Sequence, residues 1–309
     1  MSSSKTPSKP VIVIDNLSKI YPGTETPALD RLTIKVHEGE VYGFLGPNGA
    51  GKSTAIRMLM NFILPSSGTA TIAGKDITKD TLEIRSSIGY LSGDLAMYPK
   101  MTGSQFLDYM NSLQSAPVSS KVIETLAKRL KANLSKPIGE LSRGNRQKIG
   151  IIQAFMHDPE VLILDEPTSG LDPLIQETFL ELVREAKDRG ACVFMSSHVL
   201  SEVQKVCDRV GIIKEGKLVS EKDIREMAIE AAQTFEIVFA KKAPLTALKS
   251  VPGIKIESHK GGTVIIHMHG ALAPLFAVLA RHEVLKIDAR NLDLEESFMH
   301  FYQDAEAVS

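Results

Sequence analysis

Short apolar runs rich in β-branched residues alternate with helix-like segments across residues 11–219. Such runs, when turn residues bound them, are typical of strands. Several are apolar throughout, which is expected of strands buried on both faces of an α/β sheet. The pattern predicts an α/β domain over residues 11–222, with strands at Val11–Ile14, Leu32–Val36, Val41–Leu45, Thr69–Ala73, Val161–Leu164, Ala191–Met195 and Val210–Ile213.

The pattern becomes helical between Arg85 and His157. Within 121–131, Val122, Leu126 and Leu130 recur every fourth residue and would form one apolar stripe on a helix. We therefore predict a helical subdomain over about residues 85–157, inserted into the α/β pattern.

A second domain is expected over residues 232–309, after a boundary near 220–232. Its segments alternate in the order β-α-β-β-α-β, which predicts a small α+β domain of the ferredoxin-like kind. Gly261 and Gly262 suit a hairpin between the two middle strands, and a last helix at Leu294–Tyr302 would close the domain. The expected elements are Thr234–Ala240, Pro244–Val251, Ile254–Ser258, Thr263–His269, Leu272–Arg281 and Val284–Ala289.

Charge and hydropathy narrow the range of partners. A net charge of −1 argues against a broad basic surface for nucleic acid, so no nucleic-acid partner is expected. No run approaches the ~18 consecutive apolar residues of a membrane span. Residues 1–10 are polar and are predicted to be a disordered tail rather than a secretory signal. Cys192 and Cys207 lack metal-ligand spacing and fit buried thiols of a reducing cytosol. The chain is expected to be soluble and to reach a membrane only through a partner.

One motif predicts a phosphate-binding loop. It reads GxxxxGKST, follows the apolar run Val41–Leu45 and precedes a predicted helix at Ser53–Asn61. Its glycines let backbone N–H groups converge on phosphate oxygens at a helix N-terminus. Lys52 would bridge the β- and γ-phosphates, and the Ser53 hydroxyl would bind Mg²⁺. The residues predicted to bind ATP here are Gly46, Pro47, Asn48, Gly49, Ala50, Gly51, Lys52, Ser53 and Thr54.

Two acids end the apolar run Val161–Leu164 and complete the predicted hydrolytic site. Asp165 would hold Mg²⁺ through water. Glu166 would polarise the attacking water as a general base. Standing alone, the segment would be an ordinary strand with two surface acids, but beside the phosphate loop it predicts catalysis.

Further segments make the chain resemble the ABC transporter ATPase family over roughly residues 11–220. Leu141, Ser142, Arg143, Gly144 and Asn145 resemble the LSGGQ signature. In the family, this loop reaches across a dimer and offers its serine and a glycine N–H to the γ-phosphate bound by the other subunit. The resemblance gives these roles to Ser142 and Gly144, and it implies a P-loop NTPase core with an antiparallel β edge and a helical subdomain.

Three more residues take their roles from the same resemblance. Asp172 ends a segment, 169–172, that resembles the D-loop, which couples the two sites of the dimer. His198 resembles the switch histidine that contacts the γ-phosphate, and is therefore a predicted catalytic residue together with Glu166 and Lys52. Tyr21 resembles the aromatic residue that stacks on adenine, although a tyrosine packed at a strand edge is the alternative.

The sequence departs from the family pattern at two places. Gly93 stands where the family usually has a glutamine that contacts Mg²⁺, and Asp94 follows it as a possible substitute. Arg143 and Asn145 replace a glycine and the glutamine of the signature. The segment around Gly93 and the C-terminal residues 293–302 resemble ATPases of drug, antibiotic or polysaccharide exporters whose membrane subunits are separate chains.

The resemblance thus implies an ATPase, with ATP and Mg²⁺ as ligands, that pairs with a second copy of itself and drives separately encoded transmembrane permease subunits. It would be cytoplasmic and peripheral on the inner face of the membrane. Two alternatives stay open. One is a soluble ABC-type ATPase acting on a machine such as the ribosome, which would usually carry two cassettes or a long insertion. The other is a non-catalytic nucleotide sensor, which Glu166 and His198 disfavour.

Overall fold

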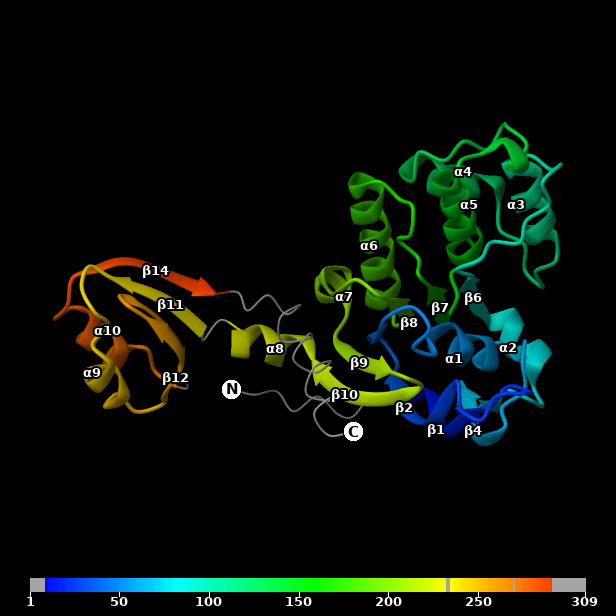
Figure 1. Ribbon diagram of the computed structural model, residues 1–309. Helices are drawn as coiled ribbons and strands as arrows, with labels where there is room; N and C mark the ends of the chain where they lie inside the picture. Colours follow the sequence, from blue (N-terminus) through cyan, green and yellow to red (C-terminus); the bar gives the residue numbers. More distant parts are fainter. Residues whose placement is uncertain (1–8, 232–233, 269, 291–309) are drawn as a thin grey trace. The chain divides into compact units, whose positions relative to one another are not determined.

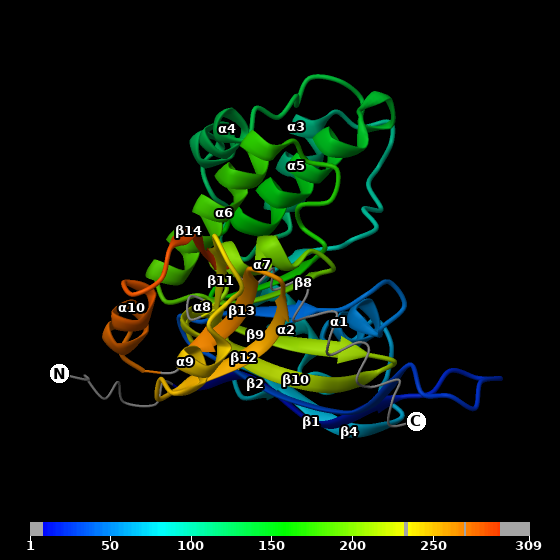
Figure 2. The same ribbon diagram turned by 60° about the vertical axis from the view of Figure 1, so that its left-hand side comes forward.

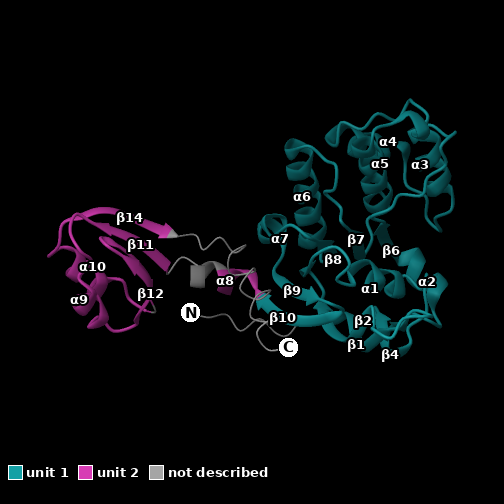
Figure 3. Ribbon diagram, viewed as in Figure 1, with its two compact units in different colours: residues 1–222 teal, residues 223–309 magenta. Residues whose placement is uncertain are grey.

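The computed structural model describes residues 9–231, 234–268 and 270–290 and divides the chain into two compact units, 1–222 and 223–309 (Figures 1 and 3). Residues 1–8, most of the predicted tail, and the predicted helix Leu294–Tyr302 lie outside the described residues. Within the described ranges, 9–231, 234–268 and 270–290, no helix combines the length and apolar character that a membrane crossing requires.

A six-stranded sheet organises the first unit. Its strand order is β10-β9-β3-β8-β7-β6, and the neighbours from β9 to β6 run parallel. The three strands β3, β7 and β8 are buried along their whole length, as their apolar runs predict. The strands are β3 Val41–Leu45, β6 Ile88–Leu91, β7 Val161–Asp165, β8 Cys192–Ser197, β9 Arg209–Lys214 and β10 Lys217–Asp223.

A second, antiparallel sheet forms the β edge of the same unit, with the order β2-β1-β4-β5. Its strands are β1 Pro10–Lys19, β2 Leu29–His37, β4 Ser67–Ile72 and β5 Lys75–Asp76. One apolar core joins Ile14 of β1, Ile56 of helix α1 (Lys52–Leu59) and Phe194 of β8, so both sheets and α1 share one interior. This confirms the predicted P-loop core with an antiparallel edge.

The helical part of this unit begins later in the chain than predicted. Ile88–Leu91 form β6, an edge strand of the parallel sheet, so only the residues beyond β6 depart from the α/β core. Helices α3, α4 and α5 gather at one side of the unit in two views (Figures 1 and 2), and the end of α5 packs against Gly89 of β6. The helices of the unit beyond α1 are α2 Thr81–Ser87, α3 Gly103–Ser112, α4 Ser120–Arg129, η1 Ile138–Glu140, α5 Arg143–Phe155, α6 Pro173–Asp188 and α7 Leu200–Val206.

The predicted stripe on α4 is partly wrong. Val122 is 38% exposed, whereas Ile123, Leu126 and Leu130 are buried. The buried positions follow spacings of three and four, which average to the 3.6-residue turn. Residues spaced strictly by four turn progressively around a helix of 3.6 residues per turn, so Val122 lies off the face that packs against the core.

The second unit begins with helix α8 Ile224–Ala231, which lies in the predicted boundary segment. Its sheet has the order β12-β13-β11-β14, and all neighbours are antiparallel. This is the ferredoxin-like arrangement that the β-α-β-β-α-β order predicts. Lys260 pairs with Thr263, so Gly261 and Gly262 form the expected two-residue hairpin. The elements are β11 Thr234–Phe239, α9 Leu245–Lys249, β12 Ile254–Lys260, β13 Thr263–Met268, α10 Ala273–Leu279 and β14 Val284–Arg290.

Candidate nucleotide-binding site

The phosphate-binding loop connects β3 to α1 and is shaped by its glycines. Gly51 precedes the helix with φ of +108°, in the left-handed region that favours glycine. A Cβ atom on Gly46 would collide with the carbonyl oxygen of Ile213 in β9. The strand–loop–helix context that the motif requires is therefore present, and the N-terminus of α1 opens onto the loop.

A pocket of about 180 Å³ lies against this loop. It brings together eight predicted site residues, while Gly46 and Ala50 belong to the loop but not to the pocket wall. Lys52 is only 5% exposed, and its Nζ donates to the carbonyl oxygens of Gly46 at 2.6 Å and Pro47 at 3.1 Å. The wall consists of Ala28, Pro47, Asn48, Gly49, Gly51, Lys52, Ser53, Thr54 and Glu166.

The two predicted acids sit at the carboxyl end of β7. Asp165 is 6% exposed, and its Oδ1 accepts a 2.6 Å hydrogen bond from Ser196 Oγ on the neighbouring strand β8. The same Ser196 Oγ accepts a 3.0 Å hydrogen bond from the backbone N–H of Glu166. Glu166 has φ of +48°, a conformation that a non-glycine residue rarely adopts. Ser196 thus fixes both acids as the strand ends.

Three predicted catalytic side chains meet at this point. Lys52 Nζ lies 3.2 Å from Glu166 Oε1, an ion pair by distance without hydrogen-bond geometry. His198 Nδ1 lies 2.7 Å from Glu166 Oε2, and the His198 side chain is 49% exposed. Glu166 is therefore held between a buried cation from the phosphate loop and an accessible imidazole. A carboxylate so placed beside a phosphate pocket can orient a water and accept its proton.

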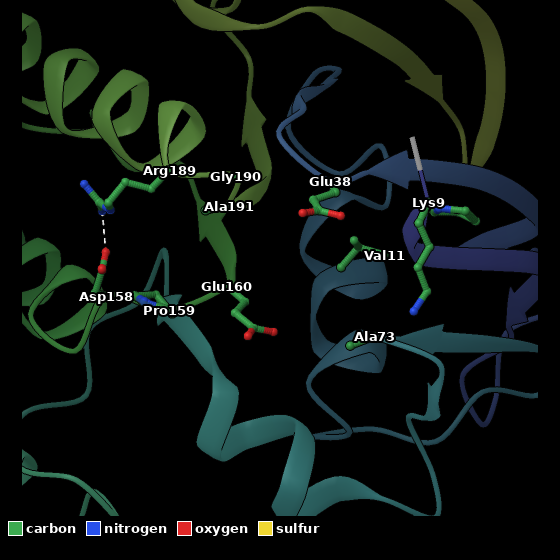
Figure 4. Close-up of a pocket in the computed structure, with 11 residues that line it drawn as sticks. Lys9, Val11, Glu38, Ala73, Asp158, Pro159, Glu160, Arg189, Gly190 and Ala191 are labelled. Atoms are coloured by element: carbon green, nitrogen blue, oxygen red, sulfur yellow. Dashed lines mark ion pairs between the residues drawn. The ribbon is translucent and has the colours of Figure 1, made fainter. Parts of the chain in front are cut away.

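A larger cavity, of about 430 Å³, lies at the opposite ends of the sheet strands from the phosphate loop (Figure 4). Glu160 and Ala191 in its wall directly precede β7 and β8, so the cavity lies at the amino ends of these strands. The Arg189–Asp158 ion pair, at 2.5 Å, and Glu38 line it as well. Ligands of open α/β sheets bind beyond the carboxyl ends of the strands. The smaller pocket at the phosphate loop is therefore the candidate nucleotide site.

Comparison with known proteins also points to an ATP-binding protein. Residues 29–169 match the family model described as ABC transporter. The chain is 35% identical over 300 residues to the bacitracin transport ATP-binding protein BcrA of Bacillus licheniformis, covering 94% of this chain and 96% of that protein. The chain belongs to the ABC transporter ATP-binding family. It is an ATP-binding subunit and an ATPase.

Other members of the ABC family agree with this. The Enterococcus faecalis protein of the same name is 36% identical over 219 residues, or 70% of each chain. A solved ATP-binding subunit of an ABC transporter has a TM-score of 0.65 and 27% identity, and covers 71% of this chain and 92% of that one. A dimeric ATP-binding cassette bound to ADP and Pi has a TM-score of 0.64 at 22% identity, which supports the fold.

The residues that resemble the ABC signature and D-loop do not line this subunit's own pocket. Ser142 is the N-cap of α5, and its Oγ accepts from the N–H of Asn145 at 3.2 Å. Asp172 is the N-cap of α6 and accepts from Ile175 N–H at 3.1 Å. Gly144 lies in the first turn of α5. The structure thus gives Ser142 and Asp172 a capping role and leaves both, with Gly144, outside the phosphate pocket.

Tyr21 follows β1 and is also absent from the wall of the phosphate pocket. Its ring lies under the Lys19 ammonium, with 5.5 Å between Nζ and the ring centroid. An aromatic face that is open to one side can stack on a base. The structure places Tyr21 in the loop just after β1, and its contact with adenine stays a prediction.

The donor set fits Mg²⁺. Asp165 offers carboxylate oxygens and Ser53 a hydroxyl, and Mg²⁺ prefers such oxygen ligands together with phosphate and water. Only one Asp165 oxygen is bonded to Ser196, whereas Oδ2 faces Gly93, where a Cβ would lie 3.2 Å away. Among residues 9–231, 234–268 and 270–290, no group of three or more His, Cys, Asp or Glu side chains could hold a metal alone. Phosphate oxygens would have to complete the coordination.

Two residues with a part in the site went unrecognised at the sequence level. Ser196 has no motif of its own, and only the parallel pairing of β7 with β8, Asp165 opposite Ser196, brings it to the acids. Gln147 is 3% exposed, and its Nε2 donates to the carbonyl oxygen of Pro167 at 2.9 Å. The sequence does not show that Gln147 is buried, and only the structure reveals the partner that a buried amide needs.

Proposed function

We propose that this ABC ATPase powers an exporter by hydrolysing ATP in a head-to-tail dimer attached to separately encoded transmembrane subunits. The observation that carries the hydrolytic part is the cluster of Lys52, Glu166 and His198 at the phosphate loop. Glu166 takes the proton of the attacking water, and Lys52 stabilises the charge on the transferred phosphoryl group. His198, which is half exposed, contacts the γ-phosphate.

Mg²⁺ belongs to the proposal through Ser53 and Asp165. The ion, when bound, neutralises charge on the β- and γ-phosphate oxygens. The Asp165 carboxylate is held in one orientation by Ser196, so its free oxygen stays available. The N–H groups of the phosphate loop and the dipole of α1 add further attraction for the phosphates.

The proposed dimer is supported by the position of the signature residues, which do not line the phosphate pocket of their own subunit. Ser142 and Gly144 stand outside the phosphate pocket, at the N-terminus of α5, where a helix dipole favours an anion. A second copy turned head to tail would bring these groups to the γ-phosphate, and Asp172 would lie in the contact between the copies. ATP then joins two subunits, and its hydrolysis removes the contacts that hold them together.

The exporter assignment rests on the relatives. Two bacitracin transport ATP-binding proteins match the chain, one of them over almost its whole length. Bacitracin-like antibiotics are therefore the proposed substrate class. The proposed contact for the membrane subunits is the stretch from Gly93 to Thr102, which carries the 53% exposed Tyr98 before α3. The protein would then work at the inner face of the cell membrane.

An affinity purification from detergent-solubilised cells tests this proposal. Tagged full-length Glu166→Gln protein with ATP traps the closed dimer, and Lys52→Ala, which should bind ATP poorly, is the control. Recovery of a polytopic membrane protein with Glu166→Gln, and much less with Lys52→Ala, is the expected result. Recovery of ribosomes or other soluble complexes without a membrane protein would contradict the transporter proposal and favour a soluble ABC-type ATPase.

A further inference from the structure

The first turns of α5 dock on the segment that follows the two catalytic acids. Gln147 comes four residues after Arg143 and three after Gly144, so it shares one side of the helix with both. All three contact residues within 166–170. The signature end of α5 and the segment after Glu166 are therefore packed together within one subunit.

The contact of Arg143 is made by both its charged head and its stem. Its Nη2 donates a 2.8 Å hydrogen bond to Ser169 Oγ. The stem runs over Gly170, where an added Cβ would lie 3.5 Å from Arg143 Cγ. Gly170 has φ of +78°, so a glycine also suits the backbone there. The arginine thus lies across the Ser169–Gly170 turn, with its stem within van der Waals reach of Gly170.

Two further contacts set the distance between the helix and this turn. A Cβ on Gly144 would lie 2.5 Å from the carbonyl oxygen of Gly170, so the two backbones approach as closely as a glycine allows. One turn later, the buried amide of Gln147 donates to Pro167 O. These contacts would hold the helix in place. Arg143 is the only one of the three that reaches the side chain of Ser169.

We propose that Arg143 is a positioning residue, which ties the signature end of α5 to the Ser169–Gly170 turn of its own subunit. The tie keeps Ser142 and Asp172, the caps of two helices proposed to face the partner, in a fixed relation before ATP arrives. A surface ordered in advance loses less conformational entropy on association. The inference rests on the proposed head-to-tail dimer. It assigns a task to the arginine that replaces a glycine of the family signature.

The consequence for dimerisation is tested in the Glu166→Gln background. Arg143→Ala and Ser169→Ala should each weaken ATP-dependent dimerisation about fivefold, as loss of one exposed hydrogen bond of ordinary strength would. The double variant should be no weaker than either single variant, because both changes remove the same bond. Analytical ultracentrifugation at saturating ATP measures the dissociation constants. Lys148→Ala is the matched control, since it removes one positive charge from the same helix and Lys148 donates only a long, 3.4 Å hydrogen bond, to Lys131 O, within the part of the chain that the structure describes.

The tie itself is tested in the monomer, without ATP. Arg143→Ala should raise hydrogen exchange of the amides in residues 168–172 about fivefold over Lys148→Ala, and Arg143→Lys should restore part of the protection. Unchanged exchange would overturn the inference. The inference would also be overturned if Arg143→Ala dimerised weakly while Ser169→Ala dimerised normally, because the arginine would then act on something other than Ser169. Increased exchange in a protein that never dimerises would instead refute the proposed function while retaining the tie.

Discussion

The two halves of the site are held by different kinds of contact. The phosphate-loop half is built on β3, β7 and β8, all wholly buried, and its Lys52 and Asp165 are almost fully enclosed. The signature half sits on helix ends at the surface, and single polar bonds such as Arg143–Ser169 position it. Enclosed charges hold one geometry, since leaving them unpaired is costly. Surface bonds can be removed with little loss of stability, so changes in the half proposed to face a partner should affect dimerisation more than folding.

Glu166→Gln should have the largest effect, because it removes the base while leaving the side chain's size unchanged. We expect ATPase turnover to fall by at least about a hundredfold, the usual contribution of a general base. ATP binding should persist. The matched control is Glu160→Gln, just before the opposite end of the same strand, and this variant should keep normal turnover. Equal turnover of the two variants would exclude Glu166 as the base.

Ser196→Ala tests whether the core half depends on its buried bonds. The change removes the hydroxyl that bonds Asp165 and the Glu166 N–H. Unfolding free energy should drop by about 1–3 kcal/mol, the cost of unsatisfied buried groups. Turnover should fall by about tenfold as the acids lose their orientation. Denaturant unfolding and steady-state ATPase assays measure the two effects.

Ser197→Ala is the control for that experiment. Its hydroxyl is equally buried but bonds Glu202 and Val199 rather than the two acids. It should lose stability and keep turnover. If both variants kept normal turnover, Ser196 would have no part in holding the acids.

Gly93→Ala should have a smaller effect, confined to the Mg²⁺ dependence of ATPase activity. The added Cβ would lie 3.2 Å from Asp165 Oδ2, so the carboxylate must shift by a few tenths of an ångström. We expect the Mg²⁺ concentration for half-maximal ATPase activity to rise about threefold, in the low range of effects on groups that support metal ligands. Gly139→Ala creates the same 3.2 Å contact with Pro99 O, away from the acids, and should leave the Mg²⁺ dependence unchanged.

Tyr42→Phe should have the smallest effect and concerns stability rather than turnover. Burial, and then the nearby Glu221, raise the pKa of Tyr42 well above its ordinary value, and its hydroxyl donates to Glu221 Oε1 at 2.7 Å. Stability from the neutral phenol is therefore complete below about pH 10 and declines as pH rises towards the folded-state pKa.

The measurement for Tyr42 is unfolding free energy as a function of pH. Tyr42→Phe should cost about 1 kcal/mol at pH 7, for one hydrogen bond. The variant should also lose less stability than the wild type above pH 10. Tyr98→Phe, on an exposed side chain, is the control and should follow the wild-type curve. A wild-type curve parallel to that of Tyr42→Phe above pH 10 would contradict this account.

The motif residues of the core half could be predicted from the sequence because each carries a local signal. The phosphate loop follows an apolar strand, and Asp165 and Glu166 end another, so strand, motif and chemistry fall within a few residues. Ser196 could not be predicted, since its contact depends on the pairing of β8 with β7. Tertiary pairing also decides that Ile88–Leu91 join the sheet, where a short apolar run alone was ambiguous.

The signature half was harder to predict, because its contacts cross between segments that lie far apart in the chain. The resemblance singled out Ser142, Gly144 and Asp172 but not the bond from Arg143 to Ser169, which joins residues 26 positions apart. It also gave no sign that Asn145 bonds the backbone of Asn133 with both its amide atoms. Local patterns specify elements and caps, whereas such pairs depend on how the helices pack.

The central claim, a composite site shared by two copies, is tested most directly by mixing two inactive variants. Glu166→Gln lacks the base, and Ser142→Asp keeps the α5 cap but sets a negative charge against the partner's phosphate. Each alone should be nearly inactive. An equal mixture should regain roughly a quarter of wild-type ATPase activity, because mixed pairs hold one complete site. No recovery on mixing, or normal activity of Ser142→Asp alone, would contradict the composite site.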